Sequence, residues 1–189
     1  MRVPGSPARV ASAAVDLVAA AEGVAGVVRA NADEAEQLRR LPAATVDALV
    51  AAGLMRMYVP AAYGGPEVDP PTALQAMEAV AVADAAAGWC TMIAATTSSL
   101  AVFLPPDAAR EIYGDPAVVT GGVFAPNGTG QVARGAVTVT GRWQWGSGTQ
   151  HCRWIVGGVL CDDDAFRICY LDADDVCHVS WNVTSSASR

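Results

Sequence analysis

Two glycine-bearing stretches in the second half of the chain carry the residue types best suited to holding a polar heterocycle. They are Phe124-Ala125-Pro126-Asn127-Gly128-Thr129-Gly130 and Gly141-Arg142-Trp143-Gln144-Trp145-Gly146-Ser147-Gly148. Each offers backbone N–H groups, small side chains that allow close approach, and one hydroxyl, from Thr129 or Ser147. Trp143 and Trp145 add flat apolar surface. The same spacing is also typical of two hairpin turns with cross-strand tryptophans, and the residues alone leave both interpretations open.

The motifs of several other chemistries are absent from the sequence. It has no Walker motif, no G-x-S-x-G and no G-x-G-x-x-G that opens a helix. The only histidines, His151 and His178, each stand beside a cysteine, but neither pair has the ligand spacing of a zinc site. We therefore predict no dinucleotide site of the Rossmann type and no bound metal. The residue types single out no catalytic side chain.

The net charge indicates which partners the protein is expected to lack, and the cysteines indicate the cellular compartment in which it is expected. Twelve Lys and Arg residues against 19 Asp and Glu residues give a net charge of -7 over 189 residues. Such a balance would repel a phosphate backbone, so we expect no nucleic-acid partner. The five cysteines include no C-x-x-C pair, which is unlike the disulfide framework of a secreted protein. We expect reduced thiols in a cytoplasmic protein.

An uncharged stretch over residues 85–106 is long enough in principle to cross a bilayer. It contains five hydroxyl residues and lacks a basic flank, which is unusual for a membrane span. It sits between expected helices of ordinary acidic and alanine-rich composition. We therefore predict a buried helix of a bundle rather than a transmembrane helix, and no membrane partner.

The first half of the chain has the composition of a helical bundle. Alanine-rich segments with apolar residues at helical spacing predict helices, and glycines and prolines predict their ends. Thr72 is the expected cap of the fourth helix, and Gly88 is the expected break before the uncharged helix. The expected helices cover residues 9–30, 33–38, 42–53, 72–87, 89–104 and 107–113, with a loop over residues 55–70.

The second half has the pattern of short strands. Runs of β-branched and aromatic residues, broken by Gly, Asn and Asp, cover residues 118–124, 137–145, 154–160, 166–171 and 176–183. No helical segments separate them, which favours an antiparallel sheet or barrel over a parallel doubly wound sheet. Residues 162–164 are the expected hairpin turn. The predicted fold class is α+β, with a helical bundle domain over residues 1–115 and an incomplete antiparallel β domain over residues 116–189.

Motifs along most of the chain resemble the acyl-CoA dehydrogenase superfamily. In the helical half these are Leu41-Pro42-Ala43, Ala51-Ala52-Gly53-Leu54, Val59-Pro60-Ala61-Ala62-Tyr63-Gly64-Gly65-Pro66, Gly88-Trp89, Leu104-Pro105-Pro106 and Glu111-Ile112-Tyr113-Gly114-Asp115-Pro116. In the β half, Gly141, Trp143, Ser147-Gly148 and Trp154 look most like the branch of flavin-dependent hydroxylases, such as the oxygenase component of p-hydroxyphenylacetate hydroxylase. The motifs occur in the family's order over about residues 30–183.

The resemblance implies a flavin, FAD or FMN, lying across the edge of the β domain. Residues on the family's first flavin-contacting loop are Phe124, Ala125, Gly128 and Thr129, and those on the second, beside flavin N5, are Trp145, Gly146 and Ser147. Dehydrogenase members usually carry a threonine at the position of Gly146 and a Thr-Glu pair near Phe124-Ala125. These departures favour the hydroxylase-like branch, in which reduced flavin reacts with oxygen and Ser147 bonds the isoalloxazine edge.

The activity implied by the resemblance is that of a flavin-dependent oxidoreductase. It is either acyl-CoA dehydrogenation or hydroxylation with reduced flavin and oxygen, on an acyl-CoA or a small aromatic substrate. After Trp181-Asn182-Val183-Thr184, which resembles the start of a family strand, the sequence departs from the family and stops at Arg189. We therefore expect the last strands and the C-terminal helical domain to be absent, and a homo-oligomer or partner chain to cover the exposed surface. The alternative is a truncated, non-catalytic remnant or interaction module.

Overall fold

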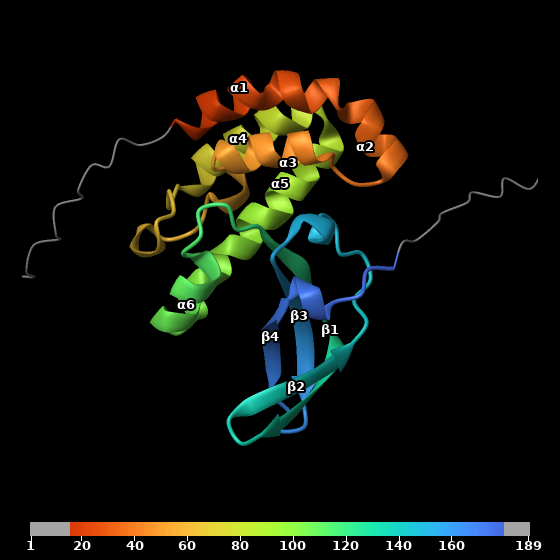
Figure 1. Cartoon of the computed structure of the whole chain (residues 1–189). Helices are drawn as coiled ribbons and strands as arrows, with labels where there is room; N and C mark the ends of the chain where they lie inside the picture. Colours follow the sequence, from red (N-terminus) through yellow and green to blue (C-terminus); the bar gives the residue numbers. More distant parts are fainter. Residues whose placement is uncertain (1–15, 180–189) are drawn as a thin grey trace, which may run out of the picture.

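The computed structural model describes residues 16–179, which form a helical half followed by a sheet. Figure 1 shows the helices gathered at one end of the molecule and the sheet at the other, with one helix, α5, running from the bundle toward the sheet. The helices are α1 (Leu17–Ala30), α2 (Ala32–Leu38), α3 (Ala43–Ala51), α4 (Pro70–Ala83), α5 (Ala85–Ser98) and α6 (Pro106–Tyr113). The part of the first expected helix before residue 16 lies outside the described residues.

Aspartate side chains begin the long helices. Asp69 caps α4, because its carboxylate accepts a hydrogen bond from the backbone N–H of Thr72 at 3.1 Å. The prediction that Thr72 is the cap was wrong by three positions, since Pro70 and Pro71 are tolerated in the first helical turn. Asp84 caps α5 in the same way, through the backbone N–H of Ala87 at 2.7 Å.

Gly88 lies inside α5 and does not end a helix, so the predicted break at this residue was wrong. A β-carbon at Gly88 would lie 2.5 Å from the β-carbon of Ala81 in α4. The glycine therefore allows α4 and α5 to pack closely, and the extended backbone of Asp84 provides the break. The expected loop over residues 55–70 also contains two short 3₁₀ turns, Leu54–Arg56 and Ala61–Tyr63.

The sheet has four strands in the spatial order β2-β1-β3-β4. They are β1 (Thr120–Ala133), β2 (Ala136–Gly141), β3 (Trp154–Cys161) and β4 (Phe166–Asp172). The predicted fold class, helices first and an incomplete sheet afterwards, is confirmed. One feature of the sheet differs from the prediction, because β1 and β3 run parallel while β1–β2 and β3–β4 are antiparallel. The connection over residues 142–153 returns the chain to the start of β1, which makes the parallel pairing possible.

The first glycine-bearing stretch is part of a strand and not a separate loop. β1 continues through it, and the pairing of β1 with β3 shifts register between Val123 and Gly128. The expected strand over residues 176–183 is absent from its described part, because residues 176–179 form neither helix nor strand. Residues 180–183 lie outside the described residues. The hairpin turn expected at residues 162–164 joins β3 to β4 as predicted.

α5 connects the bundle to the sheet. One core cluster gathers the helices around α5, and a second, smaller one joins α6 to the sheet through Val59, Ala101, Ile112, Tyr113 and Val118. The hydroxyl groups of Tyr113 and Tyr170, from α6 and β4, lie 2.9 Å apart in hydrogen-bond contact. Within the described residues, Ala85–Phe103 is the segment long and apolar enough to cross a membrane. In this fold it packs against α4 and β1.

Candidate functional site

The tight turn that follows Trp143 is the most unusual backbone feature of the sheet half. Trp145 has a φ of 66°, a left-handed conformation that is uncommon for a bulky residue, and Gly148 has a φ of 70°. The backbone N–H of Ser147 donates to the carbonyl of Trp145 at 2.9 Å, and the Thr149 hydroxyl donates to the carbonyl of Gly146 at 2.8 Å. Strained residues of this kind cluster at ligand sites, so the turn over residues 145–150 is a candidate site on backbone geometry alone.

The indole of Trp143 anchors this turn to the sheet. It lies over three glycines, one each on β1, β2 and β3, namely Gly128, Gly141 and Gly157. A β-carbon at Gly157 would lie 2.7 Å from the indole, and one at Gly141 also 2.7 Å. The indole nitrogen donates to the carbonyl of Gly158 at 2.9 Å. The glycines therefore leave room for one aromatic ring against the sheet, and that ring fixes where the 145–150 turn begins.

Two pockets meet at the 145–150 turn. The first, which we call the sheet pocket, has a volume of about 1020 Å³ and is lined by residues of all four strands, by Trp143, Trp145 and Gly146, and by residues 175–179. The second, the helix pocket, has a volume of about 690 Å³ and lies between α2, the start of α5 and residues 146–151. Both pockets touch Gly146 and Gln150, so the turn is a shared wall.

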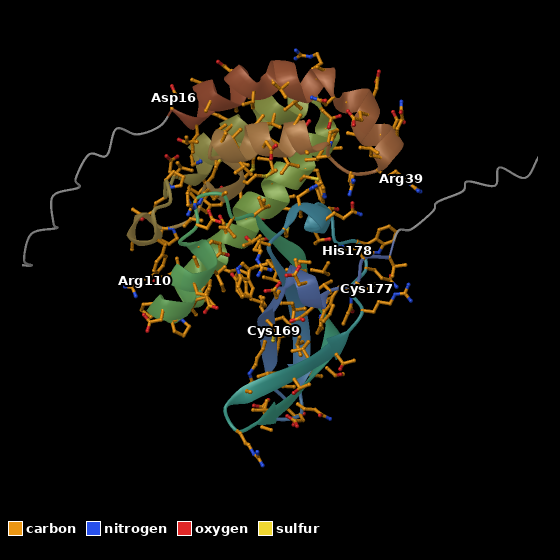
Figure 2. All side chains as sticks on the ribbon, viewed as in Figure 1. Asp16, Arg39, Arg110, Cys169, Cys177 and His178 are labelled. Carbon is orange, nitrogen blue, oxygen red and sulfur yellow. The ribbon has the colours of Figure 1, made fainter. Side chains whose placement is uncertain are left out.

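Figure 2 shows where labelled residues of the two pockets lie. Cys177 and His178 stand at the end of the described chain beside the sheet, and Arg39 stands on the helical side. The pockets therefore open on neighbouring parts of the molecule, one built by strands and one by helices.

The residues predicted on the second stretch are brought together, while those on the first lie elsewhere on the sheet. Trp145, Gly146 and Ser147 form the turn, in which Trp145 is 74% exposed and Ser147 is half-buried. The Ser147 hydroxyl makes no hydrogen bond within residues 16–179. Trp145 lines the sheet pocket, Ser147 lines the helix pocket, and Gly146 lines both.

The four predicted residues of the first stretch lie on β1. The backbone carbonyls of Phe124 and Ala125 lie directly over Gly158 of β3, where any side chain would collide with them. Thr129 is exposed, and its hydroxyl donates to the carbonyl of Thr140 at 3.3 Å. Gly128 contacts the Trp143 indole, which connects the first stretch to the second. None of these four residues lines either pocket.

The helical half lines one side of the helix pocket, and the residue patterns of the β half did not predict this. Trp89 of α5 is 55% exposed and lines the helix pocket together with Arg40, which follows α2. Gly148 packs against Cys90, since a β-carbon there would lie 3.4 Å from the Cys90 sulfur. In the sequence, Trp89 stands in the expected uncharged helix and in a family motif. Its spacing on an apolar helix gave no sign that its ring faces a pocket.

Burial controls the titration of the side chains around the turn. Burial raises the pKa of the Cys90 thiol to about 11, with the nearby Asp84 carboxylate adding to the effect, and raises that of Cys152 to about 12. Both thiols are therefore protonated at neutral pH and are poor nucleophiles. Burial lowers the pKa of His151, and the charge of Arg40 lowers it further. The described residues contain no cluster of three or more His, Cys, Asp or Glu side chains placed to bind a metal ion.

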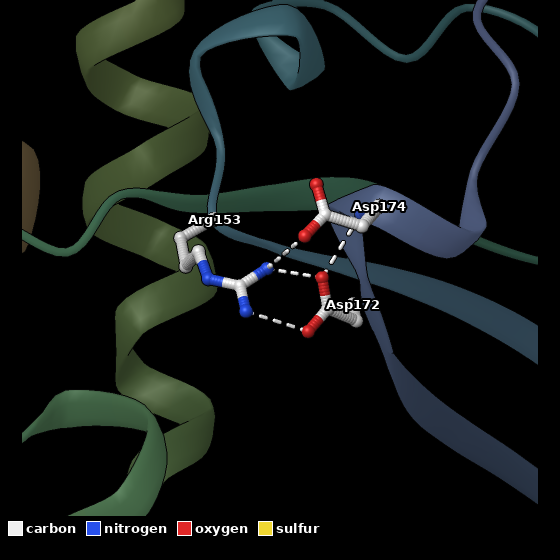
Figure 3. Close-up of polar contacts among 3 residues, drawn as sticks. All are labelled: Arg153, Asp172 and Asp174. Atoms are coloured by element: carbon white, nitrogen blue, oxygen red, sulfur yellow. Dashed lines mark hydrogen bonds and ion pairs between the residues drawn. The ribbon is translucent and has the colours of Figure 1, made fainter.

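An ion-pair cluster holds the segment after the turn. Figure 3 shows the Arg153 guanidinium facing the neighbouring carboxylates of Asp172 and Asp174. Arg153 donates to both oxygens of Asp172, one of them at 2.6 Å, and lies 3.8 Å from a carboxylate oxygen of Asp174. The same guanidinium lies over the Trp154 ring, 5.6 Å from its centroid. The start of β3 and the end of β4 are thereby joined, which fixes the C-terminal end of the loop that carries the turn.

Comparison with protein families and curated relatives gives consistent matches. Residues 17–104 match the family described as acyl-CoA dehydrogenase, N-terminal domain. The chain is 33% identical over 138 residues to the oxygenase subunit HsaA of a flavin-dependent monooxygenase from Rhodococcus jostii (strain RHA1), covering 72% of this chain and 36% of the relative. It is 31% identical over 140 residues to the oxygenase component of p-hydroxyphenylacetate 3-hydroxylase from Acinetobacter baumannii, covering 73% and 33%. The chain thus spans about a third of the length of these relatives.

Solved structures give the same grouping. The 3-HSA hydroxylase from Rhodococcus sp. RHA1 superposes with a TM-score of 0.82 at 29% identity, covering 89% of this chain and 45% of that one. XiaF from Streptomyces sp., in complex with FADH2 and glycerol, superposes with a TM-score of 0.79 at 26% identity, covering 91% and 45%. Residues 17–104 are therefore an acyl-CoA dehydrogenase N-terminal domain, and the chain is similar over most of its length to proteins named as oxygenase components of flavin-dependent hydroxylases and monooxygenases.

Proposed function

We propose that this chain forms the flavin-facing part of an oxygenase component that hydroxylates a small aromatic compound with reduced flavin and oxygen. The observation that carries the proposal is the position of Ser147. Its hydroxyl has no partner within residues 16–179, and it stands on a strained turn between two pockets. Relatives that share this sequence region are named as a flavin-dependent monooxygenase and as an FADH2-dependent hydroxylase.

The residues of the 145–150 turn fit a flavin. The exposed Trp145 ring offers a flat apolar surface, and the uncommitted Ser147 hydroxyl can donate to or accept from a heterocycle. Gly146 leaves the backbone between them open to close approach. A β-carbon at Gly146 would lie 3.1 Å from the Thr149 side chain, so a threonine here, as in many dehydrogenases, would be crowded.

Each residue then has a role that its surroundings define. Trp145 would support the ring system, Gly146 would expose its backbone, and Ser147 would hold the polar edge by a hydrogen bond. Phe124, Ala125, Gly128 and Thr129, on the neighbouring strand β1, would extend the contact surface along the sheet. The reduced flavin, when bound, supplies the electrons that activate oxygen for insertion into the ring. The protein supplies position, orientation and shielding from water.

Hydroxylation is favoured over acyl-CoA dehydrogenation because the relatives are monooxygenases and because Gly146 departs from the dehydrogenase pattern. Reduced FAD is supported by two relatives. One is a resorcinol hydroxylase from Rhizobium sp. that is named as FADH2-dependent and is 28% identical to this chain. The other is XiaF, whose complex contains FADH2. FMN remains the alternative flavin, and titration separates the two.

The test is a titration of the purified 189-residue chain with FAD and with FMN, each oxidised and chemically reduced, followed by tryptophan fluorescence. Trp145 is exposed at the proposed contact, so flavin binding should quench the emission. We expect saturable quenching with at least one reduced flavin. A second assay supplies externally reduced flavin, oxygen and a phenol, and measures flavin oxidation and the hydroxylated product.

Each result identifies one of the functional classes. Oxygen-dependent oxidation with a hydroxylated product supports the proposal. Reduction of tightly bound oxidised flavin by an acyl-CoA would identify a dehydrogenase instead. A protein that stays colourless, with unquenched fluorescence for all four flavin forms, would favour the non-catalytic module and end the proposal.

A further inference from the structure

The helix pocket shares the 145–150 turn with the sheet pocket and has a mixed lining. Its volume of about 690 Å³ is enough for a small substituted aromatic molecule. Apolar surface comes from Trp89 and Leu41, and polar groups come from Ser147, His151 and Arg40. The flat Trp89 ring is 55% exposed, so it is available to contact a second aromatic ring. Ser147 belongs to both this pocket and the proposed flavin contact, which places the pocket beside the site of the chemistry.

His151, like Ser147, is a side chain of this pocket whose hydrogen-bonding capacity is unused within residues 16–179. Its backbone is fixed, because its N–H donates to the carbonyl of Gly148 at 3.0 Å in the 3₁₀ turn Thr149–His151. Its imidazole is half-buried and makes no hydrogen bond or ion pair within residues 16–179. A half-buried polar ring with no partner is available to a ligand that brings a complementary group.

The electrostatic surroundings keep this imidazole neutral at pH 7. Burial lowers its pKa below the ordinary value, and the positive charge of Arg40 lowers it further. The other charged and titratable groups that line the pocket are Asp33, Glu36 and Arg39 on the α2 side, and Asp84 and Cys90 on the α5 side. A neutral imidazole carries one N–H donor and one nitrogen lone pair that accepts a hydrogen bond. It can therefore accept a hydrogen bond from a ring hydroxyl.

We propose that His151 is a substrate-binding residue that accepts a hydrogen bond from the hydroxyl of a phenol-type substrate whose ring contacts Trp89 in the helix pocket. This inference rests on the proposed function and extends it, because it assigns substrate recognition to a residue of this chain. Ser147 and His151 stand four positions apart on the same short segment. One segment thus holds the flavin edge and the substrate hydroxyl, which fixes the substrate ring relative to the flavin.

The test compares two ligands of similar shape. The probe p-cresol carries a hydroxyl that can donate, whereas 4-methylanisole carries a methoxy group that cannot. Binding to the full chain is measured by calorimetry, without flavin and again with saturating FMN. We expect p-cresol to bind about two- to tenfold more tightly than 4-methylanisole, the effect of one hydrogen bond.

Three variants separate the effect of the imidazole on binding from the effect of the pocket around it. His151→Phe keeps an aromatic ring without an acceptor, so the preference for p-cresol should disappear. His151→Gln keeps an acceptor oxygen, so part of the preference should return. His178→Gln removes the other histidine of the chain, which lines the sheet pocket and not the helix pocket, and should leave the preference measured without flavin unchanged. Using the ratio of the two affinities in each variant cancels any general change in pocket shape.

The pH dependence gives a readout that a purely structural role would not produce. Protonation removes the acceptor, so p-cresol affinity should fall as the pH drops through the pKa of His151, while 4-methylanisole affinity should not. In His178→Gln a single imidazole remains, and its NMR resonance can be followed directly. Bound p-cresol should shift that resonance and lower the His151 pKa further, because the phenol binds the neutral form.

Equal binding of the two ligands, or a preference that survives in His151→Phe, would overturn the assignment. So would the absence of p-cresol binding both with and without FMN. These results differ from a failure of the proposed function, which the flavin titration and the assays of flavin oxidation and reduction decide. A chain that takes up reduced flavin but ignores the ring hydroxyl would retain the proposed function and lose the role of His151.

Discussion

Ser147 is the residue on which the flavin assignment depends most directly. We expect Ser147→Ala to weaken flavin binding about two- to tenfold, because one hydrogen bond to the cofactor is lost. Folding should be nearly unchanged, since the hydroxyl has no partner within residues 16–179. Fluorescence titration with reduced FAD and FMN measures the affinity, and urea denaturation measures the free energy of unfolding.

Thr129→Ala is the companion variant on the first stretch. A similar loss of flavin affinity is expected, but here the hydroxyl also donates to the carbonyl of Thr140, so a small loss of stability should accompany it. If Ser147→Ala had wild-type stability and unchanged affinity for every flavin, the hairpin-turn interpretation of these stretches would be the better one.

The glycines beneath Trp143 give a second prediction at the residue scale. Gly157→Ala should destabilise the protein by about 1–3 kcal/mol, because the new methyl group would lie 2.7 Å from the indole and force it to move. Displacing the indole should also weaken flavin binding, since Trp143 fixes the start of the 145–150 turn. Chemical denaturation and flavin titration measure the two effects.

Gly23→Ala is the matched control. Gly23 lies inside α1, where a β-carbon would meet nothing within 4 Å. The substitution should therefore stabilise the protein by about 0.5–1 kcal/mol through helix propensity, without any effect on flavin. Equal effects of the two substitutions on stability would show that the Trp143 contact is not tight.

Among the elements, those with strong periodicity were predictable from the sequence and those set by contacts between elements were not. α1 and α3 follow from apolar spacing, and β4 from its β-branched and aromatic run. The role of Gly88 in helix packing could not be predicted from the neighbouring sequence, because it depends on contact with Ala81 of another helix. The parallel pairing of β1 with β3 was also hidden, since strand direction depends on the path of residues 142–153. The domain boundary at residues 115 and 116 stays a prediction.

The candidate site was predictable from the sequence only where local features define it. The 145–150 turn stood out through its glycines and tryptophans, which are local features. The helix pocket needs Trp89 and Arg40 from the other half of the chain, and no spacing along the sequence reports that contact. The spacing of His151 in the sequence bears only on metal binding, because its neutral, unpartnered state depends on burial that the fold creates.

The β3–β4 hairpin carries a prediction about pH. Arg167 donates to both carboxylate oxygens of Asp163, at 2.7 and 2.6 Å, and lowers the pKa of Asp163 to about 2. In Arg167→Ala this pKa should rise toward the ordinary value of about 3.9. Carbon-detected NMR of the carboxyl group during acid titration measures it. Arg110→Ala, which removes a different exposed cation, should leave the pKa of Asp163 where it is.

The direction of the stability effect follows from that pKa. Because the folded-state value lies below the unfolded one, the pair stabilises the fold above the unfolded pKa, and this contribution disappears as the pH falls through about 2. The variant should therefore lose some stability at neutral pH but differ little from the parent in strong acid. Since both side chains are substantially exposed, the effect should be small. A larger difference in acid than at neutral pH would contradict this reasoning.

At the scale of the whole molecule, the exposed apolar side chains predict self-association. Phe103 is 81% exposed and Val102 is 63% exposed, both in the 3₁₀ turn Ser99–Phe103 that continues α5. Trp89 and Phe166 add further exposed aromatic surface. Exposed patches of this kind drive association, and the open edges of a four-stranded sheet can pair between chains. We expect dimers or larger species at tens of micromolar by light scattering, together with binding of a hydrophobic dye.

Substitution tests which surface is responsible. The double variant Val102→Ser and Phe103→Ser should reduce both association and dye binding. Val82→Ser, on α4, replaces a side chain that is 75% exposed but distant in sequence from this patch, and should have a smaller effect. A parent chain that stays monomeric and binds little dye would mean that these exposed apolar side chains do not drive self-association.

The shared wall between the two pockets has a thermodynamic consequence. Gly146 and Gln150 touch both the sheet pocket and the helix pocket, so a ligand that shifts this turn from one side alters the shape presented on the other. Linkage then requires reciprocity: the factor by which the first ligand changes the affinity for the second equals the factor by which the second changes the affinity for the first. The total free energy of binding both ligands is then the same whichever ligand binds first. The 145–150 turn sets only the factor by which each ligand changes the affinity for the other.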